Sequence, residues 1–390
     1  MENKKNAEIP GKPSDSTALL NENVPVWKTG TGKDFSAGFP EKTDVKNIDT
    51  ASIVQLMLPK IVYAETGIET RIYFHNLVLA YDKSILKFSV ECDVGINHGS
   101  YWSFTPDKPG EYRLRIIITD SAERVVGEAE TIVKAASADN GNDQNIVAMI
   151  VGDSIFGNGK IADFLQEGMI LRGNHNFRLM GSHSGQGAPL AIGKAAVEAY
   201  GGWCWDTFMT LWKPGEEYNV RTKFMKMSGE KLEPAVQEYL DKYNAGKAPD
   251  IVIFALGCNN IACASMGNIE AQIRKAEVDR TALLSMFRSA MPETLFGVVL
   301  LAPPNGRENA FEINYKGLIP RRQYLYNQFS YVKTVMETLQ DSCEISLIPF
   351  YTGVDEFSDY PEDNAVHPNE TGQRRLALML EAWLKNLNYH

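Results

Sequence analysis

The last two thirds of the chain contain short, continuous apolar runs separated by stretches with helical periodicity. Strands that are apolar on both faces belong to a parallel sheet covered by helices on both sides. The runs span residues 146–151, 177–180, 251–256, 295–301 and 345–348. The helical stretches between and after them span residues 161–169, 269–290, 321–339 and 370–387. We therefore expect a three-layer α/β domain over residues 145–390.

The preceding region, residues 51–135, has a different rhythm. Tyr112, Leu114 and Ile116 alternate with Arg113 and Arg115, the period of two that buries one face of a strand. Similar β-type runs span residues 61–63, 70–74, 77–79, 86–90, 112–119 and 131–133. The pattern predicts a small all-β sandwich, and residues 104–120 resemble an immunoglobulin-like sandwich.

Two polar segments frame this β module. Residues 1–50 are rich in Lys, Asn, Asp, Gly, Pro and Ser, which indicates an irregular leader or linker. Residues 135–144 (AASADNGNDQ) are small and polar, so we expect a domain boundary there.

Composition excludes several classes of protein. Lys and Arg total 39 against 49 Asp and Glu, and no basic block is present, so nucleic acid is not an expected partner. Residues 251–269 are uncharged, but Asn259, Asn260, Ser265 and Asn268 interrupt them, which indicates strand and loop rather than a membrane span. The first ten residues contain no apolar core of a secretory signal. Five cysteines without a CxxC pair suit neither a disulfide framework nor a zinc site.

Ser154 follows the first apolar run in the sequence Gly152-Asp153-Ser154. A serine at the carboxyl end of a parallel strand exposes its hydroxyl to a cleft and is a candidate nucleophile. A helix N-cap is the more common role for such a serine. The nearby Gly159-Lys160 does not complete a phosphate-binding loop, because that motif needs Gly at position 154 and Ser or Thr at position 161.

Three further elements fall at the same sheet edge. Asn259, after the third run, has a carboxamide that can stabilise an oxyanion, although a lone Asn there more often closes a turn. Gly202 allows a backbone N–H to approach a ligand, although alone it is only a flexible turn. His367, before the last helix, is the best placed of six histidines to act as a general base, although a His in a loop is usually polar surface.

Taken together, the blocks around Ser154, Gly202, Asn259 and His367 (GDS, GGW, GCNN and NAVHPN) resemble the four blocks of the SGNH (GDSL) hydrolases over residues 146–387. The resemblance implies a flavodoxin-like three-layer fold without a metal or cofactor. Ser154 would attack an ester carbonyl and His367 would take its proton. The N–H groups of Ser154 and Gly202 and the carboxamide of Asn259 would hold the oxyanion.

The sequence departs from that family pattern at two positions. Asn260 stands where the family usually has Asp, which leaves Asn259 unaffected. Asn364 stands three residues before His367, where the family has the Asp that orients the imidazole. We expect Asp363 to take that role, with the other acids of the same loop as alternatives: Asp355, Asp359 and Glu362.

The expected function is hydrolysis of a short acyl ester, most simply the acetyl ester of a carbohydrate. A lipase or lysophospholipase and a catalytically decayed binding protein are the alternatives. The partner is a small-molecule or polysaccharide ester, and the family implies a secreted or periplasmic protein. The oligomeric state and the compartment do not follow from the residues.

Two aromatic groups have two interpretations each. In the β module, Tyr101 and Trp102 are either sugar-stacking platforms or core residues of a scaffold. The aromatic insertion 203–247 either walls the cleft or packs on the sheet. Its aromatic residues and one methionine are Trp203, Trp205, Phe208, Trp212, Tyr218, Phe224 and Met225.

Overall fold

The computed structural model describes residues 54–80, 82–185, 188–210 and 222–388. All of them belong to one compact unit. The expected leader over residues 1–50, together with Trp212 and Tyr218 of the insertion, lies outside the described residues.

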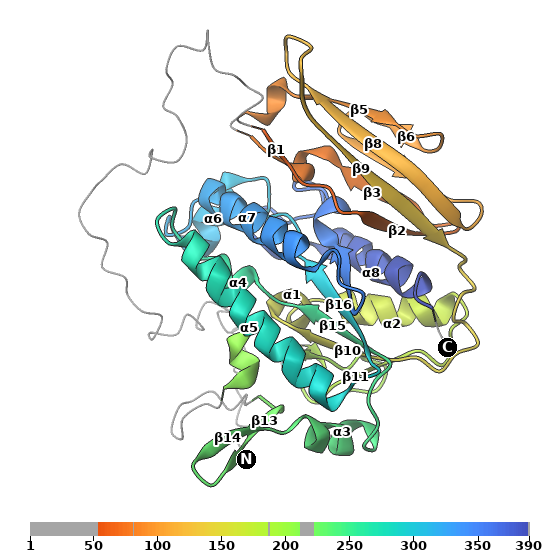
Figure 1. Cartoon of the computed structure of the whole chain (residues 1–390), viewed down its shortest axis with the longest axis vertical. Coiled ribbons are helices and arrows are strands. Elements are labelled where there is room, and N and C mark those ends of the chain that lie inside the picture. Colours follow the sequence, from red (N-terminus) through yellow and green to blue (C-terminus); the bar gives the residue numbers. More distant parts are fainter. Residues whose placement is uncertain (1–53, 81, 186–187, 211–221, 389–390) are drawn as a thin grey trace, which may run out of the picture. The chain divides into compact units, whose positions relative to one another are not determined.

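A parallel sheet forms the centre of the α/β region, which confirms the prediction from the apolar runs (Figure 1). Its strand order is β11-β10-β15-β16-β17, and the short strand β12 also pairs with β10. Every pairing in this sheet is parallel. The strands are β10 (Val147–Gly152), β11 (Arg178–Met180), β12 (Glu198–Ala199), β15 (Ile251–Ala255), β16 (Leu295–Leu300) and β17 (Ile345–Pro349).

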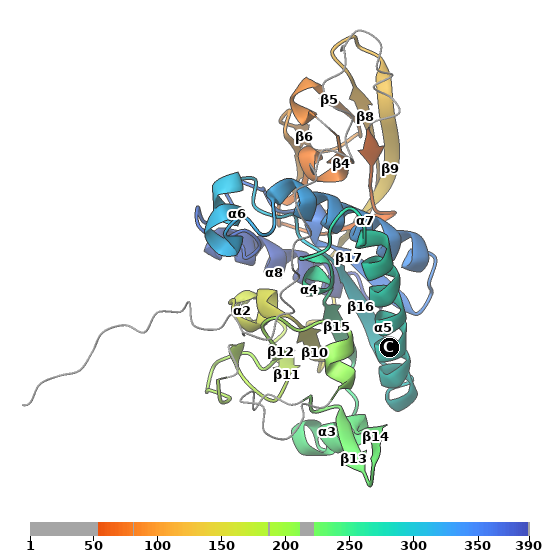
Figure 2. The same ribbon diagram turned by 90° about the vertical axis from the view of Figure 1, so that its left-hand side faces the viewer.

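Helices cover both faces of this sheet (Figure 2). In β15, Ile251 and Ile253 pack with residues of α2 and α8, whereas Val252 and Phe254 pack with residues of α5 and α7. The long helices are α2 (Ile161–Leu171), α5 (Ile269–Ala290), α7 (Arg321–Leu339) and α8 (Glu370–Lys385). The shorter ones are α1 (Ser154–Gly157), α3 (Val236–Asn244), α4 (Cys258–Ile261) and α6 (Glu308–Tyr315), with 3₁₀ turns η5 (Asp206–Met209) and η6 (Phe350–Thr352).

Residues 55–136 form β-strands in three small sheets. The sheet orders are β2-β9-β8-β5, β3-β7-β6 and β1-β4. The strands are β1 (Gln55–Leu56), β2 (Ile61–Glu65), β3 (Thr70–Tyr73), β4 (Val78–Leu79), β5 (Lys87–Glu91), β6 (Ile96–Asn97), β7 (Tyr101–Phe104), β8 (Gly110–Thr119) and β9 (Val125–Ala136). Two 3₁₀ turns, η2 (Phe74–Leu77) and η3 (Lys83–Ile85), lie between them.

The alternation predicted in β8 is present in the structure. Leu114 and Ile116 are fully buried, while Arg113 points outward and pairs with Glu130. Trp102 is 1% exposed and its indole N–H donates to the Val94 carbonyl. Of its two interpretations, the core residue is therefore confirmed and the sugar-stacking platform is wrong.

The polar segment after β9 is held in place by hydrogen bonds. Lys385 Nζ donates to the Asn140 carbonyl at 3.1 Å and to Asn142 Oδ1 at 2.5 Å. Asn140 Nδ2 donates in return to the Lys385 carbonyl at 2.6 Å. The segment therefore does not need apolar burial to be ordered, because it satisfies the end of α8 instead.

In the aromatic insertion, the described large side chains pack into the core. Trp205, Phe208 and Phe224 are fully buried, and Trp205 Nε1 donates to the Tyr331 hydroxyl at 2.8 Å. The packing interpretation therefore holds for these residues. The hairpin β13 (Met225–Ser228) and β14 (Lys231–Pro234) follows them.

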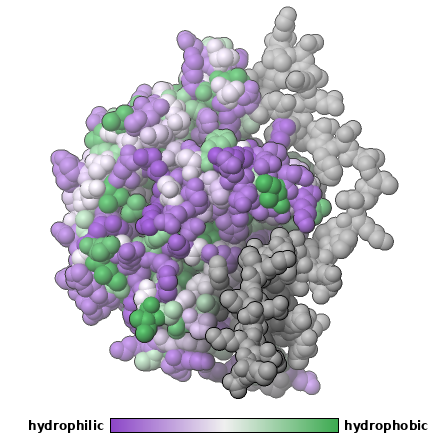
Figure 3. All heavy atoms as spheres, turned by 180° about the vertical axis from the view of Figure 1, so that it is seen from behind, coloured by the Kyte–Doolittle hydropathy of each residue, from purple (hydrophilic) through white to green (hydrophobic). Residues whose placement is uncertain are grey.

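The face of the molecule in Figure 3 is largely hydrophilic, with apolar residues in small separate groups. Within the described part of the chain, no helix has both the length and the apolar character needed to cross a membrane.

Candidate active site

The register of the parallel strands brings three of the four sequence blocks together. Gly152, the last residue of β10, pairs with Ala199 of β12 on one side and with Ala255 of β15 on the other. The segments that follow these strands therefore begin side by side at the carboxyl edge of the sheet. Ligands of open α/β folds bind at that edge.

Ser154 is the first residue of α1. Asp153, not Ser154, caps this helix, because its Oδ1 accepts the Ile155 N–H at 3.0 Å. Helix α1 also lies against β12 so closely that a Cβ on Gly157 would stand 2.6 Å from the Ala199 carbonyl oxygen. The Ser154 hydroxyl is thus free of the capping role that most serines in such a turn perform.

The structure places His367 directly against Ser154. The Nε2 atom of His367 lies 2.8 Å from Ser154 Oγ. On the other side of the ring, Nδ1 lies 3.0 Å from Asn364 Oδ1. That oxygen also accepts the backbone N–H groups of His367 at 2.9 Å and of Val366 at 3.2 Å.

These two backbone donors determine the tautomer of the imidazole. An N–H can only donate, so the Asn364 atom that faces them must be its carbonyl oxygen and not its NH₂ group. A carbonyl oxygen can only accept, so Nδ1 of His367 carries the proton. Nε2 is then the unprotonated nitrogen and accepts the hydrogen bond from the Ser154 hydroxyl.

The structure does not place Asp363 against the imidazole, which corrects the expected geometry. Asp363 is exposed and has no hydrogen-bond partner among the described residues, because the turn directs Asn364 inward instead. Of the alternatives, Asp355 accepts the N–H groups of Phe357 and Ser358, Asp359 pairs with Arg375, and Glu362 is exposed. Burial lowers the pKa of His367 below its usual value of 6.5.

Two asparagines that the sequence did not single out hold the His367 loop. Asn305 is fully buried, and its Nδ2 donates to the carbonyls of Pro361 at 2.7 Å and Asn364 at 2.8 Å. Asn314 Oδ1 accepts the Ala365 N–H at 2.6 Å. Both residues follow β16, so the one available signal was the position of Asn305 at the same sheet edge.

The candidate oxyanion donors surround the same place. Asn259 Nδ2 donates one hydrogen to the Trp203 carbonyl at 3.0 Å, which leaves its second N–H for a ligand. Gly202 has a φ of 77°, a conformation that favours glycine. A Cβ on Gly201 would lie 3.9 Å from the Ser154 Cβ, so this turn is close to the nucleophile. The backbone N–H groups of Ser154 and Gly202 have no hydrogen-bond partner among the described residues.

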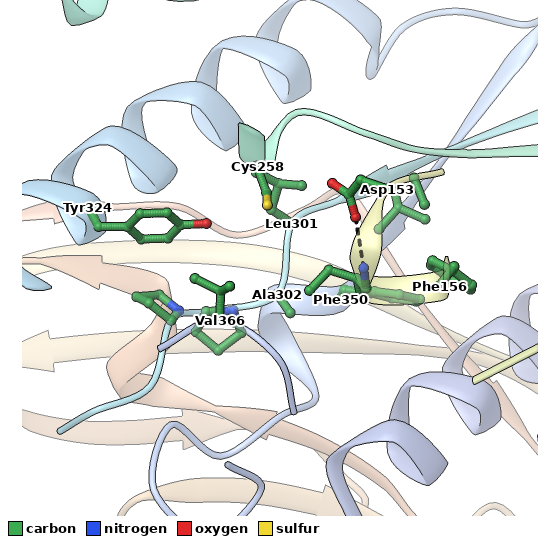
Figure 4. A pocket seen from close by; sticks show the side chains of 13 residues that line it. Asp153, Phe156, Cys258, Leu301, Ala302, Tyr324, Phe350 and Val366 are labelled. Carbon is green, nitrogen blue, oxygen red and sulfur yellow. Dashed lines mark hydrogen bonds between the residues drawn. The ribbon is translucent and has the colours of Figure 1, made fainter. Parts of the chain in front are cut away.

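A small cavity of about 30 Å³ lies near this sheet edge, and Figure 4 shows the residues that line it. Its wall includes Asp153, Cys258 and Val366, which are chain neighbours of Ser154, Asn259 and His367. Asp153 is 1% exposed, its Oδ2 has no hydrogen-bond partner, and burial raises its pKa to about 7. Cys258 and Tyr324 lie in the same wall, and burial raises the pKa of both the Cys258 thiol and the Tyr324 hydroxyl.

The part of the chain that the structure describes contains no group of three or more His, Cys, Asp or Glu residues arranged to hold a metal ion.

No protein-family model matches this chain, and no curated protein does either. Solved structures do match it. A carbohydrate esterase family 3 protein from Talaromyces cellulolyticus is 18% identical at a TM-score of 0.38, over 61% of this chain and 96% of that one. A family 3 carbohydrate esterase from Clostridium thermocellum is 15% identical at a TM-score of 0.36, over 60% and 92%. A lipase/acylhydrolase from Enterococcus faecalis is 13% identical at a TM-score of 0.32, over 62% and 95%. At such low identities the chemistry has to be argued from this chain's own side chains.

Proposed function

We propose that this protein is a serine ester hydrolase that works through an acyl-enzyme. One observation carries the proposal: Ser154 Oγ lies 2.8 Å from His367 Nε2 while Asn364 Oδ1 holds Nδ1 at 3.0 Å. A hydroxyl is a weak nucleophile unless an adjacent base accepts its proton, and this arrangement supplies that base in the required tautomer.

In the proposed reaction, Ser154 Oγ attacks the ester carbonyl and His367 Nε2 accepts the hydroxyl proton. The tetrahedral oxyanion is stabilised by the N–H groups of Ser154 and Gly202 and by the Asn259 carboxamide. His367 then returns the proton to the leaving alcohol, and the acyl group stays on Ser154. Water, activated by the same imidazole, releases the acid and restores the hydroxyl.

Asn364 has a positioning role in this proposal. Its carbonyl oxygen orients the imidazole but carries no charge, so it cannot offset the positive charge that His367 acquires. Asp363 is exposed and is not part of the machinery that we propose.

We further propose that the substrate is a short acyl ester, such as the acetyl ester of a carbohydrate. The carbohydrate rests on the sequence resemblance. The short acyl group has support in the structure, because the cavity between Ile155, Cys258 and Val366 measures about 30 Å³, a few times the roughly 10–15 Å³ that one water molecule needs and too small for a long acyl chain. The side chains of Trp205, Phe208 and Phe224 are buried, so these three aromatic residues do not form an exposed apolar wall for a long acyl chain.

The experiment is a chain-length series of nitrophenyl esters, from acetate to octanoate, with wild type, Ser154→Ala and His367→Ala. We expect acetate to be the best substrate and both variants to lose activity by at least about 10³-fold. A preference for octanoate would favour the lipase alternative. Unchanged hydrolysis in Ser154→Ala would refute the serine mechanism.

We propose that the β module is a sandwich that acts as a scaffold for the α/β domain. Asn386 supports this, since its largely buried Nδ2 donates at 2.9 Å to the Ala64 carbonyl in β2. Arg172, at the end of α2, bonds the buried Glu381 of α8 and lies 3.7 Å from the buried Glu65 of β2. The test is expression of residues 137–390 alone, which we expect to be unstable relative to the full chain.

A further inference from the structure

A hollow of about 410 Å³ opens between residues 62–71 of the β module and residues 371–382 of α8. We call it the arginine hollow, after Arg71, Arg374 and Arg375 in its wall. Small-molecule sites typically measure about 300–1,000 Å³, so this hollow has the size of a ligand site. It shares no lining residue with the cavity beside Ser154.

The floor of the arginine hollow is apolar. Val62 is 1% exposed, and Leu378 and Met379 of α8 are partly exposed in the wall. At Gly67, a Cβ would meet no atom within 4 Å, so the space in front of this turn is open. When the apolar part of a ligand covers such partly exposed side chains, the removal of apolar surface from water stabilises the complex.

The polar part of the wall consists mainly of guanidinium groups. Three arginines line the hollow, and each is paired with one carboxylate, either in the lining (Glu69) or next to it (Glu370 and Asp359). An anion would therefore be recognised by the remaining guanidinium N–H donors and not by a net positive charge.

Each guanidinium is held in place by a neighbour. Arg375 Nε lies 3.0 Å from the fully buried Asp359, and the two Nη groups of Arg375 have no hydrogen-bond partner among the described residues. Arg71 pairs with Glu69 at 2.5 Å, and Arg374 pairs with Glu370 at 2.8 Å. A guanidinium has five N–H donors, so each retains donors for a ligand and loses little freedom when one binds.

We propose that the arginine hollow binds an organic carboxylate carried on a sugar-sized ring, such as a uronic acid. The planar guanidinium fork matches a carboxylate, and the apolar floor accepts the face of the ring. This site is separate from the ester chemistry and does not require Ser154.

Isothermal titration calorimetry of the full chain with glucuronate and with glucose tests the proposal, because the two sugars differ only in the carboxylate. We expect glucuronate to bind at least about tenfold more tightly than glucose. Equal binding of the two sugars, or binding of neither, would overturn the proposal. Glucose 6-phosphate as tight as glucuronate would overturn the assignment to a carboxylate.

The variant for this experiment is Arg71→Gln with Arg374→Gln. The side chains of their partners Glu69 and Glu370 are 42% and 54% exposed, so the double change leaves no buried carboxylate unpaired. We expect glucuronate affinity to fall at least about tenfold while the melting temperature stays near that of wild type. A retained affinity in this variant contradicts the assignment.

Two controls separate this outcome from the ester chemistry. Arg113→Gln removes an exposed cation of β8 that lies outside the hollow and pairs with Glu130 of β9, and this variant is expected to bind glucuronate like wild type. Ser154→Ala is expected to bind glucuronate like wild type, so loss of esterase activity and loss of this site are independent results.

Discussion

Replacing Asn364 by Asp tests the chemistry of the imidazole most sharply. The Asn364 oxygen lies 3.0 Å from His367 Nδ1 and accepts two backbone N–H groups. A carboxylate oxygen can keep all three contacts, because it is also an acceptor. The substitution therefore adds a negative charge beside the imidazole without changing the geometry or the tautomer.

The size of the effect follows from electrostatics. An opposite charge within hydrogen-bond distance raises the pKa of a histidine by about 1–3 units, which corresponds to about 1.4–4 kcal/mol of imidazolium stabilisation. In wild type no carboxylate contacts the ring among the described residues, and burial lowers the pKa of His367 below 6.5. The variant should thus titrate higher than wild type.

The rate profile should then cross that of wild type. The imidazolium forms during attack by Ser154, so its stabilisation should raise kcat/KM at least about tenfold at pH 9. At acidic pH a larger fraction of the base is protonated in Asn364→Asp than in wild type, so the variant should be the slower enzyme there. The assay is nitrophenyl acetate hydrolysis from pH 5 to 9.5, with an NMR titration of the His367 ring protons.

The control is Asp363→Asn, which removes a real carboxylate one residue away. Asp363 is exposed and does not contact the ring, so its variant should follow the wild-type profile. Suppose that Asp363→Asn shifts the acidic limb of the pH–rate profile to lower pH and that Asn364→Asp leaves this limb unchanged. The acid that acts on His367 is then Asp363, and our reasoning is wrong.

Three further perturbations have defined outcomes. Asn259→Ala should lower kcat by roughly 10²–10³-fold, the usual loss for one oxyanion donor, and a loss under threefold in a steady-state assay would remove it from the site. Asn305→Ala should lower kcat and shift the limb of the pH–rate profile that His367 sets. The control is Asn174→Ala, which changes another fully buried Asn whose side chain donates to the Gly141 carbonyl, and it should lower only the melting temperature. Asp153 has a pKa raised from 3.8 to about 7, so wild-type stability should fall as pH rises from about 4 to 7. Asp153→Asn removes that slope and should be more stable than wild type at pH 8 by up to about 4 kcal/mol in urea unfolding; parallel pH curves would contradict the raised pKa.

The bounds of helices were predicted best from the sequence where the local periodicity of apolar residues matches the packing of the helix on the sheet. Helices 269–290 and 321–339 were placed with the bounds that the structure has, because their buried positions recur at helical spacing along the whole helix. The last helix ends at Lys385 and not at residue 387, and Asn386 just beyond it donates its carboxamide N–H to the Ala64 carbonyl of a distant strand. Such a contact leaves no mark on the local pattern.

In the candidate site, too, features that follow from the order of the strands were predictable, whereas the individual hydrogen bonds within and between loops were not. The proximity of Ser154 and His367 was predictable, because both follow strands of the sheet at the same edge. The choice between Asp363 and Asn364 was not predictable, because it depends on which side chain the turn directs inward and on which backbone N–H groups it meets. Asn305 was invisible for a similar reason, since its partners, the Pro361 and Asn364 carbonyls, belong to another loop.

The central claim is that the Ser154 hydroxyl is an activated nucleophile. Its most direct test is the intact mass of the protein after exposure to a fluorophosphonate, followed by peptide mapping. We expect one adduct per chain on Ser154, and no adduct in Ser154→Ala or after His367→Ala within the same time. A wild-type protein that stays unlabelled, or a label on another serine, would contradict the account.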